Sequence, residues 1–88
     1  MSNKNFFDNL TKLIVWDKGF PIVGYSPTTY RKDRFGAVMK FSDYGNTNSN
    51  YGWEIDHIFP VAKGGIDNIS NLEPLNWKSN RFKSDKLI

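Results

Sequence analysis

The chain has 88 residues and no cysteine, which predicts one small domain and excludes both disulfide bridges and thiolate zinc sites. Seven Phe, four Tyr and three Trp compensate for the short chain, because each can bury a large apolar area. A net charge of +3 permits a polyanionic partner without requiring one. No run of about 18 apolar residues is present and the N-terminus does not resemble a secretory signal, so we expect no membrane partner and a cytoplasmic protein.

The first third of the sequence predicts a helix followed by a break. Apolar residues at helical spacing indicate an amphipathic helix over about residues 4–15. They are Phe6, Phe7, Leu10, Leu13 and Ile14. Gly19 can end this helix and Pro21 cannot continue it. Ser26 and Pro27 stand where a cap and a first helical residue would, so a short helical turn is expected there.

The middle of the chain predicts one strand and a turn-rich connection. "GAVMKF" (36–41) alternates in the manner of a strand. "DYGNTNSNYG" (43–52) is rich in turn-forming residues. A further strand is expected directly after Gly52, in "WEIDHI" (53–58), with Trp53 and Ile55 in the core.

The last third predicts strand, loop, strand and helix in succession. The loop "FPVAKGGIDN" (59–68) turns at Gly64 and Gly65, where we expect positive φ. "NLEPL" (71–75) is expected to be extended. Asn76 is a suitable N-cap for a helix that runs to the end of the chain, with Trp77 assigned to the core.

The only histidine, His57, would on its own be read as a structural residue. Its context changes that reading, because "DHIFP…GG…NL…L…NRFK" resembles the HNH nuclease family, whose site is built on a ββα-metal finger. The resemblance covers about residues 53–83 and extends more loosely upstream through "YRKDRFGAVMKFSDYGN". Residues 1–25 are not covered by it.

The resemblance implies a role for each residue of the motif. His57 would be the general base that activates water, which suits an imidazole near neutral pH. Asp56 and the amide oxygen of Asn80 would bind a divalent metal, with Mg²⁺ or Mn²⁺ expected. Asn71 would bridge the backbone across the loop and hold the histidine in place, although Asn68 competes for that role. Glu54 would share the face of Asp56, either supporting the metal ligands or as an ordinary exposed acid.

The resemblance also implies a nucleic-acid surface on the C-terminal helix. Lys78, Arg81 and Lys83 are candidate phosphate contacts, and "YRKDR" (30–34) would extend their surface. A merely solvated basic face remains the alternative for these charges. Double-stranded DNA is the expected partner, and cleavage would leave a 5′-phosphate and a 3′-hydroxyl.

The sequence departs from many family members at the start of its last helix. Such members have a Cys-x-x-Cys-His run, in which the two cysteines hold a structural zinc. In "NWKSN", Asn76 and Ser79 stand at the cysteine positions and Asn80 at that of the histidine. An HNN-type member without structural zinc is therefore expected, and losing the imidazole ligand favours Mg²⁺ or Mn²⁺ over Zn²⁺.

The fold expected is α+β: a ββα-metal finger over residues 53–86, an N-terminal helical extension over residues 1–25, and a short additional strand or hairpin, in one domain spanning 1–88. Successive strand residues point to opposite faces, so Asp56 and His57 can share a site only if the strand bends or ends there. Two functions compete with a DNA endonuclease: a non-catalytic DNA-binding or assembly module on the same finger, and a nuclease for RNA or single strands. The oligomeric state and the target are not predicted.

Overall fold

The computed structural model describes residues 7–88, which fold as a small α+β unit. The elements within this range, in chain order, are α1 (Asn9–Trp16), β1 (Phe20–Pro21), β2 (Tyr30–Lys32), β3 (Val38–Lys40), η1 (Phe41–Asp43), β4 (Trp53–His57), η2 (Val61–Lys63), η3 (Ile69–Asn71), β5 (Leu72–Asn76) and α2 (Trp77–Lys83). The predicted fold class is confirmed, with β4, β5 and α2 as the finger.

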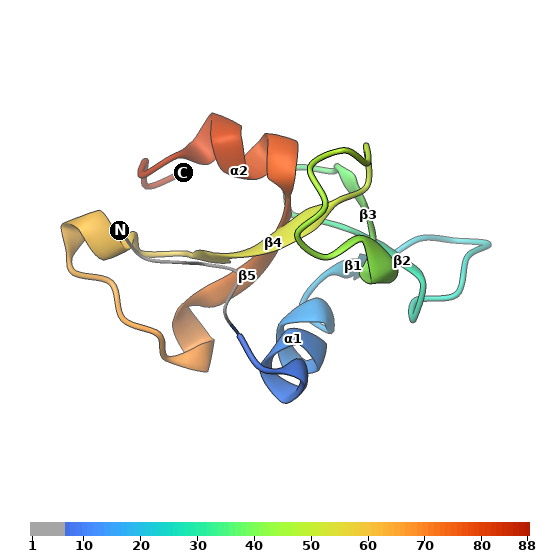
Figure 1. Cartoon of the computed structure of the whole chain (residues 1–88), viewed down its shortest axis with the longest axis horizontal. Coiled ribbons are helices and arrows are strands. Elements are labelled where there is room, and N and C mark those ends of the chain that lie inside the picture. The colour runs from blue at the N-terminus through green and yellow to red at the C-terminus, as the bar shows by residue number, and fades with distance from the viewer. Residues whose placement is uncertain (1–6) are drawn as a thin grey trace.

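The β4–β5 pair lies at the centre of the molecule. The two strands are antiparallel and in regular register from Trp53 opposite Asn76 to His57 opposite Leu72. Helix α2 lies on one side of this pair and α1 on the other (Figure 1). The pair therefore presents one face to each helix, and the residue alternation along β4 decides which side chains meet which helix.

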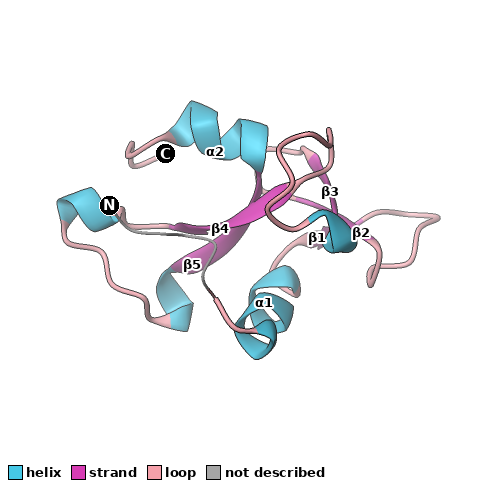
Figure 2. Ribbon diagram, in the orientation of Figure 1, coloured by secondary structure: helices cyan, strands magenta, loops and turns pink. Residues whose placement is uncertain are grey.

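A second, three-stranded antiparallel sheet has the order β1-β2-β3, and it supplies the additional hairpin that the sequence predicted (Figure 2). One of its links to the finger is the buried carboxylate of Asp33. One oxygen accepts hydrogen bonds from the backbone N–H groups of Phe35 and Ala37, at 3.0 and 2.9 Å. The other accepts from the backbone N–H of Asn76 at 3.0 Å. One side chain thus fixes the β2–β3 turn against the end of β5.

The core fills the face of β4 that is directed toward α1. Its buried members are Val15, Trp16, Met39, Trp53, Ile55 and Leu72, and the half-buried rings of Phe7, Phe41 and Tyr44 pack against them. The predicted core positions Trp53 and Ile55 are confirmed, since both are fully buried. Trp77 is only half-buried. The aromatic residues close this small core without a disulfide bridge.

Helix α1 differs from the prediction in its start and in its buried face. It begins at Asn9, because the side chain of Asp8 caps it by accepting a hydrogen bond from Thr11 N–H at 2.8 Å. Residues 4–6 of the predicted helix lie outside the described residues. The buried side chains are Val15 and Trp16. The apolar residues that predicted an amphipathic face are largely exposed, because the core contacts only the last turn. They are Leu10, Leu13 and Ile14.

Two other elements are shorter than predicted. A turn occupies residues 27–29 in place of a helical turn, and it leads directly into β2. Helix α2 ends at Lys83, followed by Ser84 with φ of 50°, so it does not continue to the end of the chain. Asn76 caps α2 as predicted, accepting a hydrogen bond from Lys78 N–H at 2.9 Å. Its amide nitrogen donates to Val38 O and Asn50 O, both at 2.8 Å.

The two loop glycines are required for different reasons. Gly64 has a φ of 97°, the left-handed conformation predicted for the turn. Gly65 does not have positive φ and is needed for space, since a Cβ there would lie 1.8 Å from Phe59 O. The loop after β4 therefore folds back closely on its own start, which shapes the surroundings of His57.

Candidate active site at the end of β4

Two acidic side chains of β4 are directed toward α2. Glu54 and Asp56 are separated by one residue and so share a face of the strand, as the sequence predicted. Both are buried, with exposed fractions of 7% and 1%. Burial of carboxylates costs free energy unless they are paired. Each of them has a partner on α2.

The partner of Asp56 is Lys83, the last residue of α2. Its ammonium lies 2.8 Å from Oδ2 of Asp56 and also donates to the backbone oxygen of His57 at 3.0 Å. Both side chains are closed off from solvent, at 2% and 0% exposed. Lys83, a predicted phosphate contact, is therefore buried against Asp56 and is not exposed with the other basic residues of α2. Residue spacing placed it on the basic helix but could not show that its ammonium is the counter-ion of a buried carboxylate.

Glu54 and Asn80 form the second pair between β4 and α2. The amide nitrogen of Asn80 donates to Oε1 of Glu54 at 2.7 Å, and both residues are buried. This bond fixes the amide nitrogen of Asn80 on Glu54, so its amide oxygen lies at the other end of the group. Glu54 is thus not an exposed strand acid, and it sets the orientation of the residue that was predicted to bind metal.

His57 lies on the opposite face of β4 from Asp56. Its ring packs against Phe7, with ring centroids 6.4 Å apart, and Phe7 in turn packs on the core. The strand stays regular up to its end at His57, which is paired with Leu72. The structure therefore does not bring the imidazole and the Asp56 carboxylate into one pocket. They are neighbours only through the backbone at the strand end.

The imidazole of His57 is buried and has one polar contact within the described residues. Its Nε2 lies 2.6 Å from Oδ1 of Asp67, in the loop between β4 and β5. The other ring nitrogen, Nδ1, is buried without a hydrogen-bond partner in the part of the chain that is described. Asp67 was not predicted as a site residue, because neither periodicity nor spacing distinguishes it from an ordinary loop acid.

Asn71 joins the two ends of that loop. Its side chain accepts a hydrogen bond from Phe59 N–H at 2.8 Å and donates to Phe59 O at 3.1 Å. It also donates to Ile66 O at 2.8 Å. The backbone oxygen of Asn71 accepts from Ile58 N–H at 2.8 Å, directly after His57. Asn68, the competing candidate, instead caps the short helix η3.

The N-terminal part of the chain also contacts this loop. The ammonium of Lys18 donates to Leu72 O at 2.7 Å and to Ile69 O. These two acceptors directly precede and follow the Ser70–Asn71 pair in the chain. Burial lowers the pKa of Lys18, and the charge of Glu73 opposes that effect. Glu73 itself is buried, and it accepts a salt bridge from Arg34 at 2.6 Å. The residues before the finger thus help to hold its loop and its second strand.

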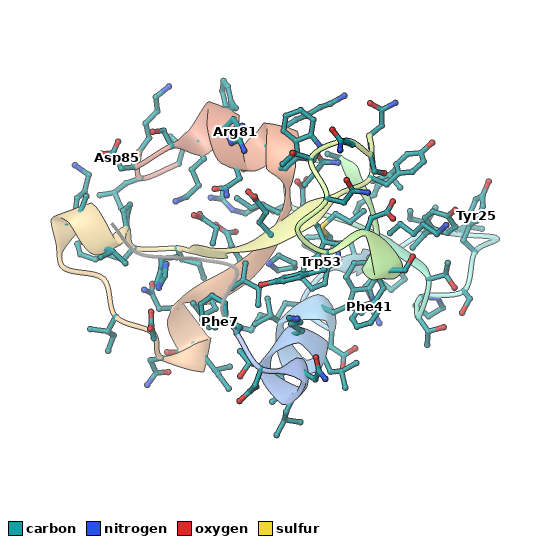
Figure 3. All side chains as sticks on the ribbon, viewed as in Figure 1. Phe7, Tyr25, Phe41, Trp53, Arg81 and Asp85 are labelled. Atoms are coloured by element: carbon teal, nitrogen blue, oxygen red, sulfur yellow. The ribbon has the colours of Figure 1, made fainter. Side chains whose placement is uncertain are left out.

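The basic residues predicted to contact nucleic acid fall into two groups. Lys78 and Arg81 are exposed, and their charges lie 5.6 and 5.5 Å from the centre of the Trp77 ring. Figure 3 shows Arg81 on α2, across the β4–β5 pair from Phe7. The segment 30–34 extends this surface less than expected, because its two arginines bind other parts of the fold. Arg31 donates to Gly19 O at 2.9 Å, and Arg34 forms a salt bridge with Glu73 at 2.6 Å.

The surroundings of Asp56 and Asn80 determine whether these residues suit a metal ion. Among residues 7–88 no group of three or more His, Asp or Glu side chains is arranged to hold a metal. Asp56 nevertheless binds a cation, the ammonium of Lys83. This ammonium supplies the positive charge that a metal ion on the carboxylate would otherwise supply. Carboxylate and amide oxygens suit a hard divalent ion, whose remaining ligands would be water and substrate phosphate. The donor set fits such an ion, provided that Lys83 moves away.

The comparisons with known proteins identify the family. No curated protein and no solved structure matches the chain significantly. Separately, no helix in residues 7–88 is long and apolar enough to cross a membrane. The family model of the HNH endonuclease matches residues 40–86, which is more than half of the chain and includes all of the finger. The chain therefore belongs to the HNH endonuclease family, a family of nucleases that act on nucleic acid.

Proposed function

We propose that this protein is a metal-dependent endonuclease that hydrolyses DNA phosphodiester bonds. The observation that carries the proposal is the buried carboxylate of Asp56, which holds a cation 2.8 Å away beside the Glu54–Asn80 pair. The family match makes a nuclease the expected activity. The resemblance of the sequence motif to this family implies a metal at this position.

In this proposal Asp56 and Asn80 bind Mg²⁺ or Mn²⁺, and Glu54 keeps the amide of Asn80 turned so that its oxygen is the ligand. The metal would stabilise negative charge on the phosphoryl and leaving oxygens. With no thiolate in the sequence and no imidazole among these ligands, the site favours a hard ion over Zn²⁺.

His57 is the proposed general base, and its free nitrogen Nδ1 is the proton acceptor. His57 and Asp56 face opposite sides of β4, and the strand ends at His57. The scissile phosphate would therefore lie across this end of the strand, where both side chains could reach it. In this conformation Nδ1 is closed to solvent, so the reaction requires that the side chains covering it move aside. Phe7, which packs against the imidazole ring, is a candidate for such a movement.

Lys78 and Arg81 are the proposed phosphate contacts, since both are exposed on α2. Contacts of this kind give affinity that does not depend on sequence. Duplex DNA is the proposed substrate, and the products would carry a 5′-phosphate and a 3′-hydroxyl.

One observation favours a second candidate, a DNA-binding or assembly module without turnover. The cation on Asp56 is supplied by Lys83, and His57 is buried, so the site is closed in this conformation. A protein that never opens this site would keep the finger and lack catalysis.

Cleavage of supercoiled plasmid in the presence of Mg²⁺ or Mn²⁺, with EDTA as the control, tests the proposal. His57→Ala should lower the cleavage rate by roughly 10²–10⁴, the usual contribution of a positioned base. Its DNA affinity should stay near that of the wild type, and circular dichroism should show that it is folded. Wild-type protein that binds DNA but cuts neither DNA nor RNA with any divalent metal would favour the module instead. Equal cleavage by the variant would remove His57 from the mechanism.

A further inference from the structure

The contact between His57 and Asp67 has a chemical consequence for the proposed base. Asp67 is mostly exposed, at 75%, whereas His57 is 1% exposed. An ionised carboxylate can only accept hydrogen bonds, and a neutral imidazole has a single N–H. The 2.6 Å contact therefore requires that a neutral His57 carries its hydrogen on Nε2. Its Nδ1 is then the unprotonated nitrogen.

The same nitrogen, Nδ1, is the buried atom without a partner in the described part of the chain. A buried acceptor without a hydrogen bond is costly, so such an atom is a natural position for an incoming water to donate to. The tautomer selected by Asp67 is thus the one in which the vacant nitrogen can accept a proton. The opposite tautomer would direct an N–H at that water and could not deprotonate it.

The loop holds Asp67 in place although its side chain is exposed. The residue before it is fixed by the hydrogen bond from Asn71 to Ile66 O, at 2.8 Å. The residue after it, Asn68, caps η3, and its backbone oxygen accepts from Asn71 N–H at 2.7 Å. Asn71 therefore fixes the backbone on both sides of Asp67. The loop acts as a support that brings one carboxylate to the imidazole.

We propose that Asp67 is a positioning residue that fixes the Nε2–H tautomer of His57 and so leaves Nδ1 as the proton acceptor. The proposal deepens the proposed function and rests on it only for its catalytic consequence. The tautomer itself can be measured whether or not the protein cleaves DNA.

Because His57 is the only histidine, its nitrogens give the only imidazole signals in a ¹⁵N-histidine-labelled sample. Two-bond ¹H–¹⁵N correlation spectra of the neutral imidazole should show the Nε2–H form in the wild type. In Asp67→Ala the ratio of Nε2–H to Nδ1–H should fall by roughly threefold to tenfold, a modest effect because the carboxylate is solvated. Asp67→Glu should restore part of the ratio. Asp85→Ala, which removes an exposed carboxylate elsewhere, should leave the ratio unchanged.

The outcomes separate this proposal from the nuclease proposal. An Nδ1–H tautomer in the wild type, or an unchanged ratio in Asp67→Ala, would overturn the role of Asp67. A shifted ratio in a protein that cleaves no nucleic acid would support the role of Asp67 and reject the nuclease. If both proposals hold, kcat in Asp67→Ala should fall in proportion to the fraction of His57 in the Nε2–H form, which changes less than the ratio does. KM should be unchanged, and the loss should be far smaller than that in His57→Ala.

Discussion

Replacing Lys83 by methionine tests whether the lysine and a metal compete for Asp56. Methionine keeps most of the apolar length of the side chain and removes its charge. The ammonium makes two contacts, one to Asp56 at 2.8 Å and one to the backbone oxygen of His57 at 3.0 Å. The variant leaves Asp56 as a buried carboxylate without its cation. It changes no proposed metal ligand.

The expected cost is large because the pair is almost completely buried. Removing one partner of a buried ion pair typically lowers the free energy of unfolding by about 3–5 kcal/mol. The same loss is expected here, since both side chains are at most 2% exposed. In a domain of this size each 1 kcal/mol lowers Tm by roughly 4–8 °C, so metal-free Lys83→Met should melt at least about 12 °C below the wild type. A divalent ion on Asp56 should recover part of that loss. At about 100 times its Kd, a ligand adds about 2.7 kcal/mol of stability.

Differential scanning calorimetry with and without Mg²⁺ or Mn²⁺ measures both effects. The metal should raise Tm more in Lys83→Met than in the wild type, because in the wild type it must first displace the ammonium. Isothermal titration should show tighter metal binding in the variant. Lys86→Met, an exposed lysine next to α2, is the matched control and should behave as the wild type. An equal metal-induced rise in Tm in Lys83→Met and wild type would mean that the two cations do not share Asp56. Weaker metal binding in the variant would show that Lys83 supports the site.

Three further predictions concern the surface, the loop and the cover of the site. Arg81→Ala should reduce the slope of log K against log salt concentration by about 0.9 for unrelated DNA sequences, whereas Lys12→Ala on α1 should leave the slope unchanged. A slope in Arg81→Ala equal to that of the wild type would place the DNA elsewhere. Asn71→Ala should lower the free energy of unfolding by roughly 1–3 kcal/mol in denaturant titrations, because three hydrogen bonds to the backbone of Phe59 and Ile66 are lost, and an unchanged midpoint with full cleavage would exclude it from the site. Phe7→Ala should speed the modification of His57 by diethyl pyrocarbonate, followed by absorbance; an unchanged rate would show that Phe7 does not cover the ring.

The finger could be predicted from sequence because its signals are local. The alternation in "WEIDH" fixes β4, Asn76 marks the start of α2, and the glycine pair marks the turn of the loop. Each of these signals acts within a few residues. The predicted strand, the cap and the core positions Trp53 and Ile55 agree with the structure for that reason, whereas Trp77 is only half-buried.

The failures involve contacts between residues far apart in the chain. Helical spacing correctly predicted a helix near the N-terminus. It could not show that only Val15 and Trp16 reach the core while Leu10 remains exposed. Charge counting placed Lys83 with the basic surface, although its burial depends on Asp56 some 27 positions earlier. Asp67 was not found at all, because its role follows from the fold of the loop over His57.

The residue alternation of β4 also explains why two adjacent residues can have separate roles. Trp53 and Ile55 must face the core, and a slip of one residue would expose both, so the register is strongly fixed. That register directs Asp56 toward α2 and His57 toward the loop and Phe7. Changes in α2 should therefore act on metal binding, and changes in the loop should act on the imidazole. In the proposed mechanism both residues reach the phosphate at the end of the strand, so variants on the α2 face should lower metal affinity and cleavage together, whereas variants on the His57 face should lower cleavage and leave metal affinity unchanged.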